Sequence, residues 1–381
     1  MQLDLYSQSL LWAFGLSVIF GAIANKANFC TMGAVSDWIN IGDLSRMRSW
    51  MLAIATAILG VGLLEYAGSI DLSLTTSNET SNPPYRSANF IWLRHLAGGL
   101  MFGVGMTLAS GCGNKTLVRL GEGNMKSLVV LVVMGFCAWW MLFSNLSYNG
   151  FLEWMLPLSI DFSQQDIPSQ DIAAVVFGLI GTEWGPTHGL VIALLAGLPL
   201  LFWILRAPDF RENLELLSAG VVIGVLIIVG WYVTAGPQGL LLMEELEFMD
   251  DPPFFTGAQS LTFIGPTGHI AQYLKEGFAA IFLTFGVATV FGVVFGSFLY
   301  TLIFRRIRLE WFVSWQDFFM HVAGAVLMGI GGVLAMGCTI GQGITGVSTL
   351  ALGSILTILS IIAGSAATMK YQYYLMMRED D

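Results

Sequence analysis

The sequence has few charged residues. Only 11% of its 381 residues are Asp, Glu, Lys or Arg, whereas 55% are hydrophobic, and the mean hydropathy is +0.72. Apolar runs of about 20 residues, the length that spans a hydrocarbon core of about 30 Å, recur along the whole chain. They leave no stretch long enough for a soluble domain. The composition therefore predicts an all-α polytopic membrane protein, with residues 1–381 forming a single membrane-embedded domain.

The chain also has few residues that bind metals. Its four cysteines are Cys30, Cys112, Cys137 and Cys338, and its four histidines are His95, His188, His269 and His321. They form no C-x-x-C pair and show no zinc-ligand spacing. We therefore expect no metal, no cofactor and no enzymatic activity. The formal net charge is −10, but in a membrane protein the distribution of charges matters more than their sum. No nucleic-acid partner is expected.

The amino-terminal residues MQLDLYSQSLLW lack the basic region and the cleavage site of a secretory signal, so the first apolar run is expected to remain as a span.

Lys and Arg are concentrated in alternate connections between the spans. Of the other connections, 71–89 holds one Arg, and 148–171 and 237–270 hold neither Lys nor Arg. The positive-inside rule places the basic connections in the cytoplasm. The expected arrangement in a bacterial inner membrane has the amino terminus outside, the carboxyl terminus inside, and spans at 9–27, 49–70, 91–110, 127–146, 171–205, 214–235, 276–303, 312–336 and 346–369.

One motif occurs twice. Residues 95–112 read HLAGGLMFGVGMTLASGC and residues 321–338 read HVAGAVLMGIGGVLAMGC, with nine of the eighteen positions identical. The nine-span topology carries the two copies across the membrane in opposite directions. We therefore expect an inverted, pseudo-symmetric repeat with halves at approximately 9–146 and 171–369, and a substrate site near the middle of the membrane.

Glycine-rich breaks follow both copies. Residues 110–114 and 337–343 contain too many glycines and polar groups to continue a regular lipid-facing helix. A third irregular segment, Gly178 to Gly189, contains Glu183, Pro186 and His188 within an apolar stretch of about 35 residues, so it predicts a re-entrant or broken helix.

Two roles are expected for the glycines. Those inside the repeated helices should allow close helix packing; they are Gly98, Gly103, Gly105, Gly324, Gly329 and Gly331. Those near the cysteines should leave backbone amides free to face an anion; they are Gly111, Gly113, Gly337, Gly341 and Gly343.

Cys112 and Cys338 lie in two of these breaks, and Cys30 follows a charge and two amides, at Lys26, Asn25 and Asn28, that interrupt the end of the first span. The candidate substrate-path residues are therefore Cys30, Cys112 and Cys338. A thiol is a weak donor with a polarisable sulfur, so it can hold a soft anion without preventing its release. Core packing or a structural disulfide is the alternative role. Cys137, which lies among apolar residues, is expected to be a packing residue.

Charged and polar neighbours complete the candidate site. Lys26 and Lys115 lie close in sequence to Cys30 and Cys112 and would attract an anion, although Lys115 can instead serve to set the topology. His95 and His321 are expected to be hydrogen-bonded packing or interface residues. The candidate supporting residues are Lys26, Asn28, Gly111, Gly113, Asn114, Lys115, Gly337, Thr339, Gly341 and Gln342.

These motifs resemble a known family. The Asn-Phe-Cys segment at 28–30, the glycine-framed Cys112 and the Met-Gly-Cys-Thr-Ile-Gly-Gln-Gly segment at 336–343 are similar to the three cysteine motifs of the YeeE/YedE sulfur-transport family. The resemblance extends from about residue 10 to 370. It implies thiosulfate uptake through an hourglass-shaped helical protein, in which Cys30, Cys112 and Cys338 relay the anion by transient S–H to sulfur hydrogen bonds. It also implies a membrane-lipid environment and a cytoplasmic TusA-like sulfur carrier as partner.

Some features leave alternatives open. Residues 297–306, where a counterpart of the Cys30 segment is expected, contain no cysteine, so the path would be asymmetric. Another sulfur or selenium compound is an alternative substrate. A membrane thiol oxidoreductase is a further alternative and would require a cysteine pair with Cα atoms under about 7 Å apart. Within the spans, Glu65 and Glu183 are the acids considered for energy coupling, which stays open together with the oligomeric state.

Overall fold

Long apolar helices dominate the computed structural model, which describes residues 4–182, 184–249 and 251–379. In these parts of the chain, nine helical segments are long and apolar enough to cross a membrane. Their main helices are α1 (Leu5–Lys26), α3 (Ser45–Tyr66), α4 (Trp92–Leu108), α6 (Met125–Phe143), α9 (Pro186–Leu205), α11 (Leu214–Ala235), α14 (Phe285–Ile303), α15 (Trp315–Leu334) and α16 (Leu352–Glu379). The predicted fold class, an all-α polytopic membrane protein, is confirmed.

Each predicted span overlaps one of these helices, and α11 coincides with the predicted 214–235. The predicted break within 171–205 is also present. The helix α8 (Ile172–Ile180) ends at Gly181, whose φ of +75° is left-handed, and α9 begins at Pro186. Glu183, which the sequence placed in this break, lies outside the described residues.

Two spans begin well after the first residue predicted for them. The span predicted from residue 276 begins as α14 at Phe285, because Gly277 and Phe278 adopt left-handed φ values of +66° and +65° that end the preceding helix. The span predicted from residue 346 begins as α16 at Leu352, after Leu350 with φ +60°. Local left-handed turns, rather than hydrophobicity, set both boundaries.

Shorter elements connect the spans. The α-helices are α2 (Thr31–Ser36), α5 (Gly113–Gly121), α7 (Asn145–Ser147), α10 (Pro208–Glu212), α12 (Pro237–Glu247) and α13 (Ile264–Lys275). The 3-10 helices are η2 (Leu72–Thr76), η4 (Glu153–Leu158), η5 (Phe162–Gln165) and η6 (Ala280–Phe282), and the π-helices are η1 (Asp37–Ile41), η3 (Tyr148–Leu152) and η7 (Gly341–Gly346). Two short strands, β1 (Asn89–Phe90) and β2 (Ile160–Asp161), pair antiparallel.

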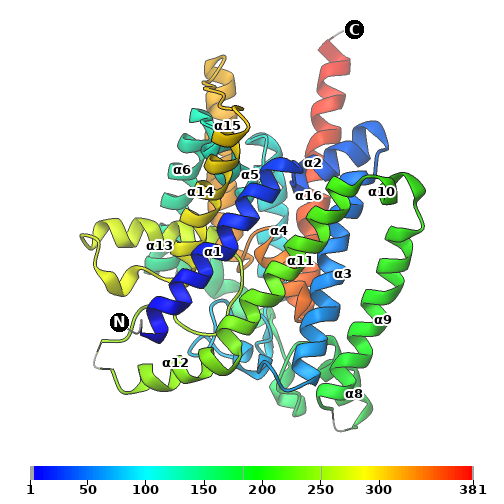
Figure 1. Cartoon of the computed structure of the whole chain (residues 1–381), viewed down its shortest axis with the longest axis vertical. Helices are drawn as coiled ribbons and strands as arrows, with labels where there is room; N and C mark the ends of the chain where they lie inside the picture. Colours follow the sequence, from blue (N-terminus) through cyan, green and yellow to red (C-terminus); the bar gives the residue numbers. More distant parts are fainter. Residues whose placement is uncertain (1–3, 183, 250, 380–381) are drawn as a thin grey trace.

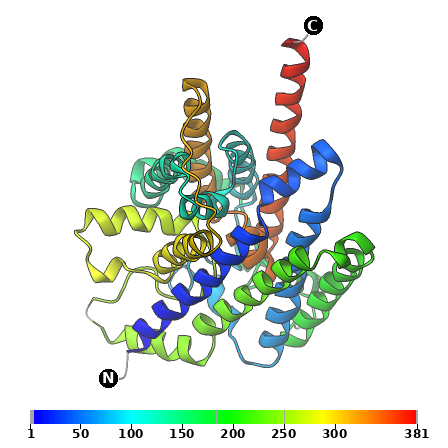
Figure 2. The same ribbon diagram turned by 45° about the horizontal axis from the view of Figure 1, so that its top comes forward.

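Helices that are distant in sequence lie side by side. The first helix, α1, packs along α14, while α4 lies against both α15 and α16, and α3 lies against α9 and α11. Figures 1 and 2 show this arrangement, with α12 and α13 lying across the direction of the long helices. The helix pairs α1 with α14 and α4 with α15 each join an early part of the chain to a late part.

The two copies of the repeated motif pack against each other through their glycines. A Cβ added at Gly98 would lie 2.7 Å from the carbonyl oxygen of Gly331, and one added at Gly324 would lie 2.6 Å from that of Gly105. Gly98 and Gly324 are equivalent in the repeat, as are Gly105 and Gly331, so the two contacts are reciprocal. The predicted packing role of these glycines is confirmed. An inverted relation between the complete halves stays a prediction.

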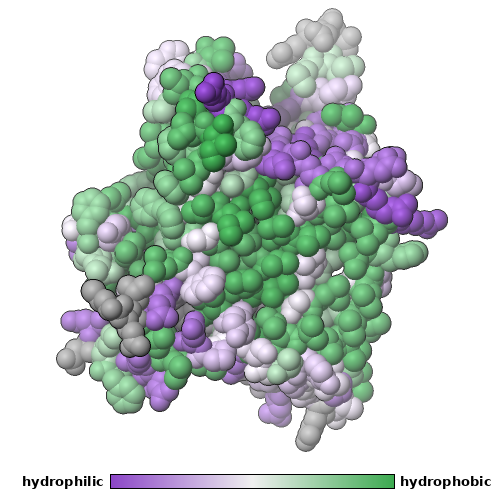
Figure 3. Space-filling model, viewed as in Figure 1, coloured by the Kyte–Doolittle hydropathy of each residue, from purple (hydrophilic) through white to green (hydrophobic). Residues whose placement is uncertain are grey.

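The outer surface is apolar around the middle of the molecule. Figure 3 shows hydrophobic residues over α1, α9 and α11, with hydrophilic residues gathered above them near α2 and α10. Many large side chains on α9 and α11 are exposed, among them Leu195, Phe202, Val221 and Val225. Such a surface suits a lipid environment, in agreement with a multi-pass membrane protein.

Candidate functional site

The three candidate cysteines occupy equivalent turns. In each turn, the amide of the residue before the cysteine donates to a carbonyl five residues earlier: Phe29 N to Ala24 O at 3.0 Å, Gly111 N to Met106 O at 2.9 Å and Gly337 N to Gly332 O at 2.7 Å. The left-handed residues are Asn28, Ser110 and Met336, with φ values of +50°, +55° and +61°. This Schellman-type cap ends α1, α4 and α15 and places a buried cysteine four residues after the last residue of each helix.

The same cap ends α14 without a cysteine. Arg306 N donates to Thr301 O at 2.9 Å, and Arg305 has a left-handed φ of +52°. The position that a cysteine occupies in the other three turns is held by Ile307. The second half of the chain therefore has a fourth turn of the same type, in which isoleucine stands at the position of the cysteine.

Cys30 and Cys112 meet at the centre of the site. Their Sγ atoms lie 3.6 Å apart and both side chains are buried. The Cys112 thiol donates to Asn114 Oδ1 at 2.6 Å, and Asn114 Nδ2 donates to Phe29 O at 3.3 Å. Asn114 therefore ties the first cysteine segment to the second.

The third segment adds polar groups beside these thiols. Thr339, which follows Cys338, lies next to the Cys112 thiol. The amide of Gly341 donates to Cys338 Sγ at 3.4 Å, and Gln342 Nε2 donates to Ala335 O at 2.8 Å. Within the described residues, the buried Thr339 Oγ1 and Gln342 Oε1 have no hydrogen-bond partner. Buried polar atoms normally have one, so these two are candidates to contact a substrate.

A pocket of about 380 Å³ opens on one side of the cysteines. Met336 and Gly337, the two residues before Cys338, form part of its wall, together with Arg94 and His269. Its described lining contains no Asp or Glu, although acids outnumber bases in the chain. This surface, called the outer pocket below because the predicted topology places it outside, is suited to an anion.

A second pocket, of about 360 Å³, is strongly basic and is called the inner pocket. Its basic residues are Lys26, Lys115, Arg119, Arg306 and Arg308, and its acidic residues are Glu122 and Glu310. Lys26 and Asn28 are exposed there, whereas Lys115 is buried and its Nζ lies 3.7 Å from Glu122 Oε1. The predicted supporting residues Lys26, Asn28 and Lys115 are thus brought together beside Cys30 and Cys112.

The two pockets lie at opposite ends of α14. Gly286, at the start of this helix, lines the outer pocket, and Arg306, just after its end, lines the inner pocket. Nineteen helical residues correspond to about 28 Å, close to the thickness of a hydrocarbon core. The Cys338 segment reaches the outer pocket, and the Cys30 and Cys112 segments reach the inner one.

The glycines beside the cysteines are closely packed. A Cβ at Gly341 would clash with the Thr262 hydroxyl, and one at Gly343 would lie 2.7 Å from the Trp50 ring. At Gly113 the nearest atom, of Ile264, is 3.0 Å away, whereas Gly111 has only ordinary contacts. Packing alone requires glycine at 341 and 343, and a role of the amides in binding an anion stays a prediction.

The expected packing residues have ordinary structural surroundings. Cys137 is partly buried, and its Cβ would lie 2.7 Å from a Cβ at Gly329. His95 Nδ1 lies 2.8 Å from Thr357 Oγ1, and His321 Nδ1 lies 2.8 Å from Asp317 O. The hydrogen bonds predicted for both histidines are therefore present, although His95 also lines the outer pocket.

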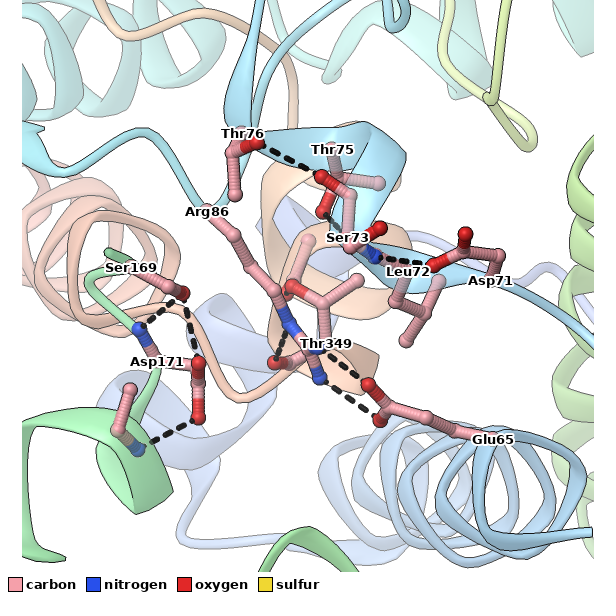
Figure 4. A network of polar contacts seen from close by, with 12 residues as sticks. Glu65, Asp71, Leu72, Ser73, Thr75, Thr76, Arg86, Ser169, Asp171 and Thr349 are labelled. Carbon is pink, nitrogen blue, oxygen red and sulfur yellow. Dashed lines mark hydrogen bonds and ion pairs between the residues drawn. The ribbon is translucent and has the colours of Figure 1, made fainter. Parts of the chain in front are cut away.

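A buried ion pair between Arg86 and Glu65 contacts the segment that follows Cys338 and η7. Arg86 donates to Glu65 through Nη1 at 2.5 Å and Nη2 at 3.0 Å, and its Nε donates to Thr349 O at 3.0 Å, shortly after η7 (Figure 4). Burial opposes the charge of Arg86, but Glu65 and Asp171 hold its pKa above the ordinary value. Glu65, considered from the sequence for energy coupling, is thus held in an ion pair.

Sequence reasoning missed Arg94 and His269 as site residues. Arg94 stands in the first turn of a predicted span, which is a recognisable signal because a charge at membrane depth is costly. His269 offered no such signal, because it lies in α13, a helix within a segment that was predicted to be a connection.

Two thiols in contact, as at Cys30 and Cys112, would also suit the thiol-oxidoreductase alternative, and the known proteins similar to this chain bear on that choice. The chain is 25% identical over 334 residues to a protein named thiosulfate transporter TsuA of Escherichia coli (strain K12), which covers 86% of this chain and 84% of that protein. It is 23% identical over 368 residues to the thiosulfate transporter TsuA of Spirochaeta thermophila, covering 93% and 97%. Relatives named as transporters support a role that is not enzymatic.

The family match covers both pockets and all three cysteine turns. Residues 26–367 match the model of the family described as Sulphur transport. This range begins at Lys26 of the first turn and ends within α16, so it includes every residue that lines the two pockets apart from Asn25. A match over most of the chain, joined to apolar spans and three buried thiols, leads to one conclusion: this chain belongs to the Sulphur transport family.

Proposed function

We propose that this protein imports thiosulfate across a bacterial inner membrane through a central path lined by Cys30, Cys112 and Cys338. The observation that carries the proposal is that Met336 and Gly337, just before Cys338, line the outer pocket, while Lys26, Asn28 and Lys115, close in sequence to Cys30 and Cys112, line the inner one. All three thiols are buried. The two relatives named as thiosulfate transporters support thiosulfate as the substrate.

The proposed orientation has the amino terminus outside and the carboxyl terminus inside. The nine candidate spans found in the described residues are an odd number, which supports termini on opposite sides of the membrane. The inner pocket contains Arg306 and Arg308, which belong to a basic connection. In this orientation, the repeat copies in α4 and α15 cross the membrane in opposite directions, which supports inverted halves at about 9–146 and 171–369.

The path must stabilise an anion in a buried place. Moving a charge out of water is costly unless several donors meet it. The thiols of Cys30, Cys112 and Cys338 are weak donors for the terminal sulfur of thiosulfate, and the hydroxyl of Thr339 is a neighbouring donor without a partner among the described residues. Several weak donors in succession allow binding without trapping the anion, so no covalent step is required.

The inner pocket then receives the anion. Its five basic side chains raise the local electrostatic potential, and this favours exit from the thiols towards the cytoplasm. We include in the proposal a cytoplasmic TusA-like sulfur carrier that accepts sulfur at this face, and membrane lipid around the apolar helices.

Uptake of labelled thiosulfate into proteoliposomes tests the proposal. We expect Cys112→Ala and Cys338→Ala to reduce the initial rate by about tenfold or more, while the matched control Cys137→Ala keeps the wild-type rate. In size-exclusion chromatography, all variants should elute with the same profile as the wild type, which shows that they are folded. Sulfate and selenite, added as competitors, should inhibit much less than unlabelled thiosulfate. Wild-type rates in both path variants would reject the thiol relay, and the absence of uptake by the folded wild type would reject thiosulfate import.

A further inference from the structure

The outer pocket contains an arginine without an acidic partner. Arg94 Nε donates to Leu334 O at 2.7 Å and Nη2 to Val333 O at 3.5 Å, both at the end of α15. Among the described residues no carboxylate lies within ion-pair distance of Arg94, whereas Arg86 on the same side of the protein is paired with Glu65. The two carbonyls fix the guanidinium at the pocket wall and leave its positive charge uncompensated.

A buried histidine lines the same pocket. His269 is only 5% exposed, and its Nδ1 has no hydrogen-bond partner within the described residues. Its ring stacks on Phe255, with centroids 3.9 Å apart and planes 5° from parallel. The stacking fixes the ring while leaving a polar nitrogen unsatisfied, and this is a costly arrangement in a protein without a ligand.

The wall of the pocket leads directly to a thiol. Met336 and Gly337 line the pocket and immediately precede Cys338. An anion held by Arg94 would therefore lie close to the first cysteine that it meets from outside. No Asp or Glu is among the described lining residues, so no carboxylate of the lining repels either charge of a dianion.

We propose that Arg94 and His269 form the external capture site of the transporter, where they bind the oxygen end of a sulfur oxyanion and direct its terminal sulfur towards Cys338. This inference rests on the proposed function and names the residues that select the substrate class. Arg94 supplies the charge and His269 a hydrogen bond. The size of the pocket, about 380 Å³, admits a small dianion together with water.

Uptake kinetics with external thiosulfate test the site. We expect Arg94→Gln to raise KM by about tenfold or more, because it removes a charge-assisted hydrogen bond to the anion, while Vmax changes little. Arg94→Lys should raise KM less than Arg94→Gln does, since it keeps the charge. His269→Phe, which keeps the ring stacking on Phe255, should also raise KM. The matched control is Arg211→Gln, at an exposed position on α10, which should keep the wild-type KM.

Two further readouts separate this inference from the proposed function. If the wild type transports thiosulfate and Arg94→Gln has the same KM, the capture site is overturned and the proposed function stands. If the wild type transports none, thermal unfolding is measured with thiosulfate, sulfate and selenite. An anion that stabilises the wild type but not Arg94→Gln would still support the capture site. No stabilisation dependent on Arg94 by any of the three would overturn it.

Discussion

The sulfur atoms of Cys30 and Cys112 lie 3.6 Å apart, although 82 residues separate these cysteines in the chain. The contact arises because α1 and α4 both end in Schellman-type turns that bring the following residue into the centre of the protein. Asn114 fixes this relationship, since it accepts from the Cys112 thiol and donates to the carbonyl oxygen of Phe29.

Oxidation should bridge this pair. Diamide, a two-electron oxidant of thiols, should convert Cys30 and Cys112 to a disulfide while it is reduced to the hydrazine, because only a small movement of the two sulfur atoms is needed. We expect uptake to stop and to recover after dithiothreitol. Peptide mapping should identify the bridge, and diamide should form no such bridge in Cys30→Ala. Failure to detect the disulfide in the wild type would contradict the close contact.

Glycine packing between helices should be sensitive to a single methyl group. A Cβ at Gly105 would lie 2.7 Å from the carbonyl oxygen of Gly324, so Gly105→Ala should force α4 and α15 apart and lower the stability by about 1–3 kcal/mol. Gly15→Ala is the matched control, because Gly15 is an exposed residue in α1 with no neighbour within 4 Å. The control should be neutral or stabilising by up to about 1 kcal/mol. Thermal unfolding in detergent measures both, and equal midpoints would argue against the packing role.

The ion pair behind the Cys338 region should contribute strongly to stability. Arg86→Ala would leave Glu65 without its partner, and breaking a buried pair from one side typically costs about 3–5 kcal/mol. We therefore expect a large fall in the unfolding midpoint. The double variant Glu65→Gln with Arg86→Gln should recover part of this loss, because it buries no unpaired charge. A double variant less stable than Arg86→Ala would show that the unpaired charge is not the cause.

Transport of a dianion should respond to membrane voltage. Moving one elementary charge across a membrane potential of about 100 mV changes its free energy by about 2.3 kcal/mol. The entry of thiosulfate, a dianion, into an inside-negative compartment is therefore unfavourable by about 4.6 kcal/mol at that potential. Glu65 is held in its ion pair, and so we expect no co-transported proton from it. Uptake into proteoliposomes should rise when a potassium gradient with valinomycin makes the interior positive, and it should not depend on an imposed pH gradient. Stimulation by the pH gradient alone would instead indicate proton coupling.

The sequence was sufficient to predict the membrane-spanning helices. A run of apolar residues long enough to cross a membrane must form a helix there, because its backbone groups have no other hydrogen-bond partners, and nine such helices are present in the described parts of the chain. Small residues at regular spacing in 95–112 and 321–338 likewise predicted the close packing seen at Gly98 and Gly324.

Helix boundaries were less predictable. The late start of α14 follows left-handed turns at Gly277 and Phe278, and α13 lies in a segment that was predicted to be a connection. Hydrophobicity reports which residues avoid water. It does not report whether a short apolar helix crosses the membrane or lies across other helices.

Tertiary structure alone decided which residues meet. The sequence determined that three cysteines follow helix ends, but only the packing of α1 and α4 places two of their sulfur atoms in contact, and only the end of α15 places Arg94 against the carbonyls of Val333 and Leu334. The physical reason is that local propensities act over a few residues, whereas the neighbours of a buried side chain depend on which helix faces fit together over the entire chain.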